Sequence, residues 1–276
     1  MKLLLIILFT FVISQLVFAN ETSDSNPWLL IDNFETNDLS SWEKRDTKNN
    51  TSPKIENPQI TEIKKEDSGN HYLIKKPAAD GVVGNRKALS FVKLPSAVEV
   101  GEVYTFYTRI NVEYFPNNHV FGLSNLDPEG IAEHDYNAFE PSLRITDKSE
   151  SSGLKNDGTL MVKLAKGYDK VQNFAEGRSA QPLEQDQWYE IWYVVNNDKF
   201  DNGGQRYNVY VRGGEFSEQT LVYQNADFRM KRELPLTYFL SNCNTGPADH
   251  PYGNGGIRYD DIYMVKGFNL SLPFSL

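Results

Sequence analysis

The chain has 276 residues, with 37 acidic and 28 basic side chains and a formal net charge of −9 at pH 7. This negative balance argues against a protein that binds nucleic acid, although a local group of cations can still hold an anionic ligand. Cys243 is the single cysteine, so no intrachain disulfide can form and stability must come from a hydrophobic core. We expect Cys243 to be a buried thiol.

Residues 1–19 have the three parts of a secretory signal peptide. Lys2 supplies a positive start, residues 3–16 are almost all apolar, and Ala19 ends a short stretch suited to cleavage. The apolar run is shorter than the roughly 20 residues that span a bilayer. The sequence therefore predicts cleavage after Ala19, secretion into the periplasm or the medium, and no membrane insertion after cleavage.

Residues 20–27 are expected to be a short disordered lead-in, and residues 28–276 a single β-sandwich domain. Short strand-like segments alternate with turns rich in Gly, Pro, Asn and Asp, and no long window has helical periodicity. We expect strands at residues 29–34, 72–75, 88–93, 103–114, 119–123, 142–146, 159–163, 188–196, 206–212, 221–224, 236–242 and 256–265. The polar segment 36–58 is expected to be a long loop.

Two of these segments carry the clearest signals. In residues 103–114, Phe106 and Ile110 fall on one side, and Tyr107 and Arg109 fall on the other, as in a strand with one face toward a core. Residues 188–196 are aromatic or β-branched on both faces, which is typical of a central strand covered on both sides. This segment should form a hairpin with residues 206–212.

Four phrases, taken in order, resemble the concanavalin A-like jelly-roll superfamily, whose nearest kin here would be laminin G-like and carbohydrate-binding domains. They are IDNFE at 31–35, GNRKAL at 84–89, WYEIW at 188–192 and RYDDIY at 258–263. The resemblance implies an all-β, antiparallel two-sheet jelly-roll sandwich. It also implies that the commonest ligand is a glycan on the concave sheet.

The same resemblance implies a structural calcium ion between an early acidic residue and a late aspartate. The residues that match in type and position are Asp32, Glu35, Asp260 and Asp261. Calcium prefers about six to eight oxygen ligands, which carboxylates and backbone carbonyls can supply. Strand alternation would point Asp260 and Asp261 to opposite faces, so both should not bind one ion directly. The alternative is that these residues cap turns and solvate a sheet edge.

Aromatic, amide and cationic side chains fall on the polar sides of several expected strands. We predict that the ligand is bound by Tyr107, Arg109, Arg144, Lys163, Asn208, Tyr210, Arg212 and Asn242. If these sides converge on the concave sheet, the surface suits an acidic polysaccharide, because aromatic rings stack on sugars and guanidinium groups pair with carboxylate or sulfate. The alternative is that each cation only keeps a sheet face soluble.

Three functions follow from this pattern. The first is a secreted, monomeric protein that binds a polysaccharide and uses no organic cofactor. The second is a polysaccharide lyase, because β-elimination needs a cation, a base and an acid, and Arg144, His250 and Tyr252 provide these types. The phrases typical of alginate-lyase jelly rolls are missing, however. The third is a laminin G-like adhesion or structural module.

Glycoside hydrolysis is disfavoured by the sequence. It needs a pair of carboxyl groups across the glycosidic bond. The nearest match is the segment 133–138, in which Ala138 stands where the second glutamate should be. The segment also lacks β-branched residues, so it is expected to be a loop and not a strand.

Overall fold

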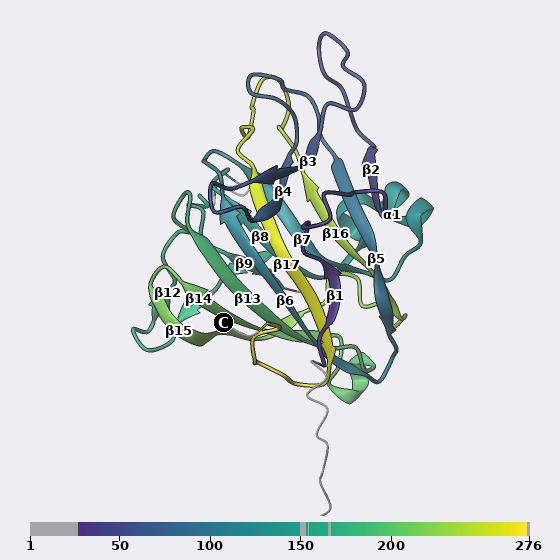
Figure 1. The fold of residues 1–276 in the computed structure, drawn as a ribbon, viewed down its shortest axis with the longest axis vertical. Coiled ribbons are helices and arrows are strands. Elements are labelled where there is room, and N and C mark those ends of the chain that lie inside the picture. Colours follow the sequence, from purple (N-terminus) through teal and green to yellow (C-terminus); the bar gives the residue numbers. More distant parts are fainter. Residues whose placement is uncertain (1–26, 150–152, 154, 165–166, 275–276) are drawn as a thin grey trace, which may run out of the picture.

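The computed structural model describes residues 27–149, 153, 155–164 and 167–274, and these form two antiparallel sheets packed face to face (Figure 1). The predicted signal peptide lies outside the described residues, as does all of the predicted lead-in except its last residue. Within the described part, no helix is long and apolar enough to cross a membrane.

Sheet A contains eight strands, and β17 lies near its middle. In spatial order they are β15 (Phe216–Asp227), β14 (Arg206–Gly213), β13 (Trp188–Asn196), β6 (Val103–Val112), β17 (Ile257–Lys266), β4 (His71–Lys76) and β3 (Ile60–Lys65), while β1 (Leu29–Asp32) also pairs with β17. The β13–β14 hairpin is confirmed, with Ile191 opposite Val211.

Sheet B contains seven strands and lies behind sheet A in the view of Figure 1. In spatial order they are β10 (Tyr168–Lys170), β9 (Met161–Lys163), β8 (Phe139–Thr146), β7 (Asn118–Ser124), β16 (Leu236–Cys243), β5 (Ala88–Val98) and β2 (Trp42–Asp46). The remaining elements are α1 (Pro128–His134), η1 (Asp135–Ala138), η2 (Phe200–Asn202) and the small hairpin of β11 (Gln172–Asn173) and β12 (Arg178–Ser179).

The main hydrophobic core lies between the two sheets. Phe106 and Ile110 of β6 meet Phe121 and Leu143 of sheet B, all of them with no exposed surface. Burying a side chain of this size contributes about 1.5–3 kcal/mol, so alternation along each strand fixes which face turns inward. A second cluster lies on the outer face of sheet B, where Ile131 anchors α1.

Every expected strand overlaps an observed one, and the two-sheet sandwich is confirmed. The expectation of a loop throughout residues 36–58 is wrong, because β2 occupies Trp42–Asp46. The strand β3 was not expected either. Both are edge strands with several charged residues, a composition that protects sheet edges from pairing with other chains and weakens the apolar signal of a strand.

The core also holds polar side chains next to Cys243, which is buried as predicted. The ammonium group of Lys75 on β4 has no exposed surface and donates to Thr61 Oγ1 (3.1 Å), Ser90 Oγ (2.7 Å) and Gln59 Oε1. No carboxylate is among these acceptors. Burial lowers the pKa of Lys75 to about 8, because the charged form loses its hydration.

We expect the difference in the free energy of unfolding between the wild type and Lys75→Met, here called the stability gap, to change with pH between 8 and 10. In this range the unfolded chain binds more protons at Lys75 than the folded chain does. The free energy of unfolding of the wild type therefore gains up to about 1.4 kcal/mol per pH unit from this group. Denaturant titrations at three pH values measure the gap. Lys93→Met, which removes an exposed lysine, should follow the wild type, and a constant gap for Lys75→Met would contradict the shifted pKa.

Candidate functional site

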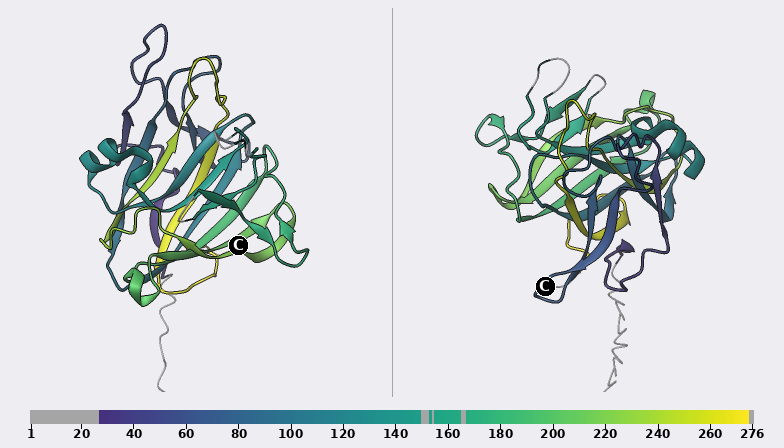
Figure 2. Two further views of the ribbon diagram at one scale, coloured as in Figure 1. Left: turned by 180° about the vertical axis from the view of Figure 1, so that it is seen from behind. Right: turned by 90° about the horizontal axis from the view of Figure 1, so that it is seen from above.

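The outer face of sheet B carries a hollow of about 440 Å³. Six cationic side chains line it: Lys48, Arg86, Lys87, Arg144, Lys148 and Arg229. Asp135 is the one carboxylate among the lining residues in the described part of the chain. The helix α1 leads into η1 at one edge of the molecule, as Figure 2 (left) shows, and η1 supplies part of the wall. The hollow is therefore strongly cationic in a chain that is acidic as a whole.

Strand alternation places Arg144 at the hollow. Its neighbours Leu143 and Ile145 on β8 enter the core, so the guanidinium points outward. Only 7% of Arg144 is exposed, and its Nη2 donates to Asn118 Oδ1 of β7 at 3.0 Å. The guanidinium is held in place by its neighbours and is not a mobile surface cation.

Tyr136 places its hydroxyl group beside Asn118, the residue that also binds Arg144. The short helix α1 ends at His134, and the next residue, Asp135, has a φ of 54° and begins η1. The Tyr136 hydroxyl accepts from Asn244 Nδ2 at 2.8 Å and lies 3.4 Å from Asn118 Nδ2. Burial raises the pKa of Tyr136, so the phenol keeps its proton at neutral pH.

Lys87 lies over the ring of Tyr136, with Nζ 3.7 Å from the ring centroid. Burial lowers the pKa of Lys87 to about 8, and repulsion from Lys48, Arg229 and Arg86 adds to this effect, while Asp135 opposes it. Lys87 can therefore lose its proton near neutral pH, which an exposed lysine cannot do.

Two further tyrosines at the hollow also contact cations. The guanidinium carbon of Arg144 lies 4.8 Å from the ring centroid of Tyr168, and Lys163 Nζ lies 5.8 Å from it. On the loop after β16, the ring of Tyr252 lies 4.9 Å from Lys148 Nζ. The hollow thus combines aromatic and cationic groups from several strands and loops.

Arg229 reaches the hollow because Glu140 holds its loop. Glu140 is completely buried, and its carboxylate accepts from the backbone N–H groups of Met230 (3.0 Å), Lys231 (2.8 Å) and Arg232 (3.2 Å), the Arg232 guanidinium (3.0 Å) and the Asn125 amide (3.1 Å). Arg229 then donates to Tyr168 Oη at 3.3 Å and to Asn137 Oδ1 at 3.1 Å.

The predicted ligand residues divide between the outer faces of the two sheets. Arg144, Lys163 and Asn242 belong to sheet B, whereas Tyr107, Arg109, Asn208, Tyr210 and Arg212 belong to sheet A. The idea that all eight converge on one surface is therefore wrong. Alternation fixes the side of a strand on which a residue lies, but it does not fix the sheet that the strand joins.

On sheet A the predicted residues already have partners. Arg212 donates to Glu190 from Nη2 at 2.7 Å, and the buried Tyr107 donates to the same carboxylate at 3.0 Å. Asn208 accepts from the backbone of Asn225 at 2.8 Å. The ring of Tyr210 packs against Phe268. These pairings leave the outer face of sheet A less cationic than the hollow of sheet B.

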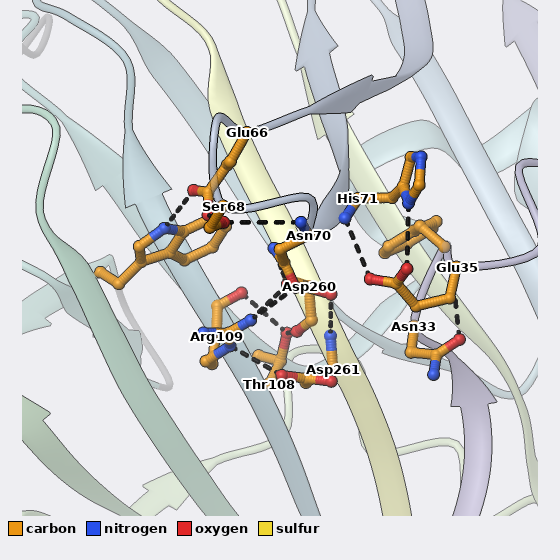
Figure 3. A network of polar contacts seen from close by, with 12 residues as sticks. Asn33, Glu35, Glu66, Ser68, Asn70, His71, Thr108, Arg109, Asp260 and Asp261 are labelled. Carbon is orange, nitrogen blue, oxygen red and sulfur yellow. Dashed lines mark hydrogen bonds and ion pairs between the residues drawn. The ribbon is translucent and has the colours of Figure 1, made fainter.

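Figure 3 shows the region of the predicted calcium ligands on sheet A. The guanidinium of Arg109 contacts Asp260 and Asp261, and its Nε lies 2.7 Å from Asp261 Oδ2. The expectation that the two aspartates point to opposite faces is wrong. The register of β17 against β6 shifts between Asp260 and Tyr263, and Asp261 has a φ of 51°, so both carboxylates reach one side.

The other predicted calcium ligands are also engaged. Glu35 accepts from the backbone N–H of His71 at 2.9 Å, and Asp32 accepts from Trp42 Nε1 at 2.7 Å. Burial, with repulsion from Asp261, raises the pKa of Asp260 to about 6. Among the described residues, no group of three or more Asp, Glu, His or Cys side chains is placed to hold a metal ion. In this arrangement the four residues do not fit calcium.

The candidate catalytic residues are only partly brought together. Arg144 and Tyr252 line the hollow, whereas His250 is exposed on the loop and is not a lining residue. Sequence reasoning missed Lys48, Arg86, Lys87, Tyr136, Tyr168 and Arg229. Most of these lie on loops or short turns without periodicity. The phrase GNRKAL, which contains Arg86 and Lys87, was the available signal.

Solved structures share this fold, whereas no protein-family model and no curated protein sequence matches the chain. A marine PL-14 alginate lyase from Aplysia kurodai has a TM-score of 0.50 and 14% identity, over 75% of this chain and 87% of that chain. Peanut lectin has a TM-score of 0.49 and 11% identity, over 83% and 98%. A GH131 β-glucanase catalytic domain from Podospora anserina has a TM-score of 0.44 and 9% identity, over 76% and 80%.

These similarities concern the fold. The alginate lyase, at a TM-score of 0.50, has the same overall fold as this chain, in agreement with the predicted antiparallel two-sheet sandwich. One fold supports many activities. The shared fold therefore does not assign a function to this chain.

Proposed function

We propose that the protein is secreted and binds an acidic polysaccharide in the hollow of sheet B as a monomer. The observation that supports this most is the excess of six cations over one carboxylate around the hollow. Like charges held together repel one another, and an anionic ligand offsets that repulsion. The three tyrosines Tyr136, Tyr168 and Tyr252 also line the hollow, and aromatic side chains are groups that sugars contact.

Affinity electrophoresis in gels that contain alginate, ulvan, pectin or carrageenan tests this proposal. We expect at least one of these polymers to retard the protein, less so at high salt, and a neutral glucan to have no effect. Arg144→Gln should remove most of the retardation. Arg212→Gln, which changes an arginine on the outer face of sheet A, should leave it unchanged. Equal loss in both variants would contradict binding in the hollow.

A second candidate function is cleavage of a uronic acid polymer by β-elimination, and the Lys87–Tyr136 pair favours it. Neutral Lys87 would take the C5 proton of the uronate, and the electron pair would form the C4–C5 double bond as the C4–O4 bond breaks. Tyr136 would donate its proton to the leaving O4, and Lys87 would return a proton to Tyr136. Arg144 and Asn118 lie beside them and would neutralise the sugar carboxylate.

Incubation of the protein with each acidic polymer, followed by ultraviolet absorbance, separates the two functions. Elimination creates an unsaturated uronate that absorbs in the ultraviolet, whereas binding alone creates no new chromophore. The initial rate should rise with pH up to about 8, the pKa of Lys87. Retardation without absorbance would leave binding as the function. If neither is seen, the adhesion-module alternative, with a protein partner, is favoured.

Thermal unfolding tests the prediction of a structural calcium ion, which the arrangement of the four residues does not favour. If calcium is bound, the midpoint temperature of unfolding in 1 mM calcium should exceed that in a chelator by a few degrees, because a ligand that binds only the folded state stabilises it. Such an ion would have to displace Arg109 from Asp260 and Asp261. Magnesium at the same concentration is the control. Equal midpoints in calcium and chelator would contradict the prediction.

A further inference from the structure

Two of the tyrosine–cation pairs in the hollow are direct neighbours. One is Tyr136 with Lys87, from η1 and the segment before β5, and the other is Tyr168 with Arg144, from β10 and β8. Asn118 links them, since its Oδ1 accepts from Arg144 at 3.0 Å and its Nδ2 lies 3.4 Å from the Tyr136 hydroxyl. A single amide therefore separates the two pairs.

The pair at Tyr168 has a larger positive charge than Arg144 alone would give it. Arg229 donates to the Tyr168 hydroxyl, and Lys163 lies 5.8 Å from the centroid of its ring. Burial lowers the pKa of Lys163, and repulsion from Arg229 contributes, while Asp227 opposes the shift. Glu140 fixes the backbone of the loop that carries Arg229, which keeps Arg229 close to the other cations.

The pair at Tyr136 has its own set of cations. Lys87 covers the ring, and Lys48 and Arg86 line the same part of the hollow together with Asp135. Lys48 is partly balanced by Asp135, at 3.5 Å. Each pair thus combines an aromatic ring with cationic donors, and one anionic sugar can contact both kinds of group.

We propose that the hollow contains two adjacent anion subsites, one at Tyr136 with Lys87 and one at Tyr168 with Arg144 and Arg229. This proposal rests on the proposed function and specifies its ligand, a polymer that carries an anionic group on neighbouring sugars, such as a polyuronate. A polymer that is charged only on every second sugar would leave one subsite facing a neutral sugar. Its cations would then lose their hydration without gaining a partner.

The test compares one polymer backbone at two charge densities. Alginate and polygalacturonate are each used as they are and after half of their carboxylates have been converted to methyl esters, and affinity is expressed per remaining carboxylate. For the wild type we expect esterification to lower this affinity about tenfold or more, because neighbouring charges are lost. The variant Lys163→Gln/Arg229→Gln should bind the native and esterified polymers about equally.

A matched control removes two cations outside the hollow. Lys93→Gln/Arg178→Gln changes an exposed lysine of β5 and an arginine of β12 that pairs with Glu215, and it should keep the full difference between the polymers. Equal affinity per carboxylate in the wild type would overturn the two subsites and leave binding in the hollow standing. Failure of the wild type to bind either native polymer would overturn both the subsites and a polyuronate ligand.

Discussion

Replacement of Glu140 by Gln is expected to lower the free energy of unfolding by about 3 kcal/mol. The buried carboxylate accepts five N–H groups, four of them from Met230, Lys231 and Arg232. An amide has one acceptor oxygen and places N–H groups against these donors, so several hydrogen bonds are lost and the Arg232 charge loses its partner. Denaturant unfolding measures the loss.

The same substitution should also weaken polymer binding. Arg229 directly precedes Met230, Lys231 and Arg232, the three residues whose N–H groups bind Glu140. We expect backbone amides 230–232 to exchange hydrogen faster in Glu140→Gln, and affinity for the acidic polymer to fall about as far as in Arg229→Gln. The double variant should then bind no more weakly than Arg229→Gln alone. Asp260→Asn removes another buried carboxylate, on sheet A, and should leave binding unchanged. Additive losses in the double variant would show that Glu140 does not act through Arg229.

Replacement of Lys87 by Arg is expected to separate binding from catalysis. Arginine keeps the positive charge but does not lose its proton in this pH range, so it cannot act as a base. If the protein is a lyase, elimination should fall by about 10²-fold to 10⁴-fold, while polymer affinity should stay within about threefold.

The measurements are the initial rate of ultraviolet absorbance and retardation in polymer gels. The matched control is Lys148→Arg, which makes the same change at another lysine of the hollow. This variant should keep most of the elimination rate. Similar rates for Lys87→Arg and the wild type would exclude Lys87 as the base. Loss of binding in Lys87→Arg would mean that lysine geometry, and not charge alone, determines affinity.

The strands were predictable because alternation is a local property of the chain. Phe106 and Tyr107 were assigned to opposite faces from sequence, and the structure agrees. The strand β2 was not predictable in this way, because its outward residues are charged and its one strong apolar signal is Trp42. The position of Asp261 was also not predictable. Its left-handed backbone inserts one extra residue into the ladder, which reverses the face expected for its side chain.

The site was harder to predict than the fold because it depends on contacts between distant segments. Arg144 was predicted as a ligand residue from strand alternation and Tyr252 as a candidate catalytic residue, and both line the hollow. Arg229 lies beyond the end of β15, and only its attachment to Glu140, some ninety positions earlier, brings it to the hollow. The grouping of strands into two sheets likewise rests on pairings between remote segments, so sequence alone placed Arg212 with Arg144 wrongly.

The contrast between an acidic chain and a cationic hollow has a kinetic consequence. The chain outside the hollow carries a net negative charge that repels a polyanion, so encounter at the cationic hollow on sheet B is favoured. Added salt screens this repulsion as well as the attraction. The affinity should therefore depend on ionic strength less steeply than six cations alone would imply. The preference of the polymer for the hollow over other faces should be greatest at low ionic strength.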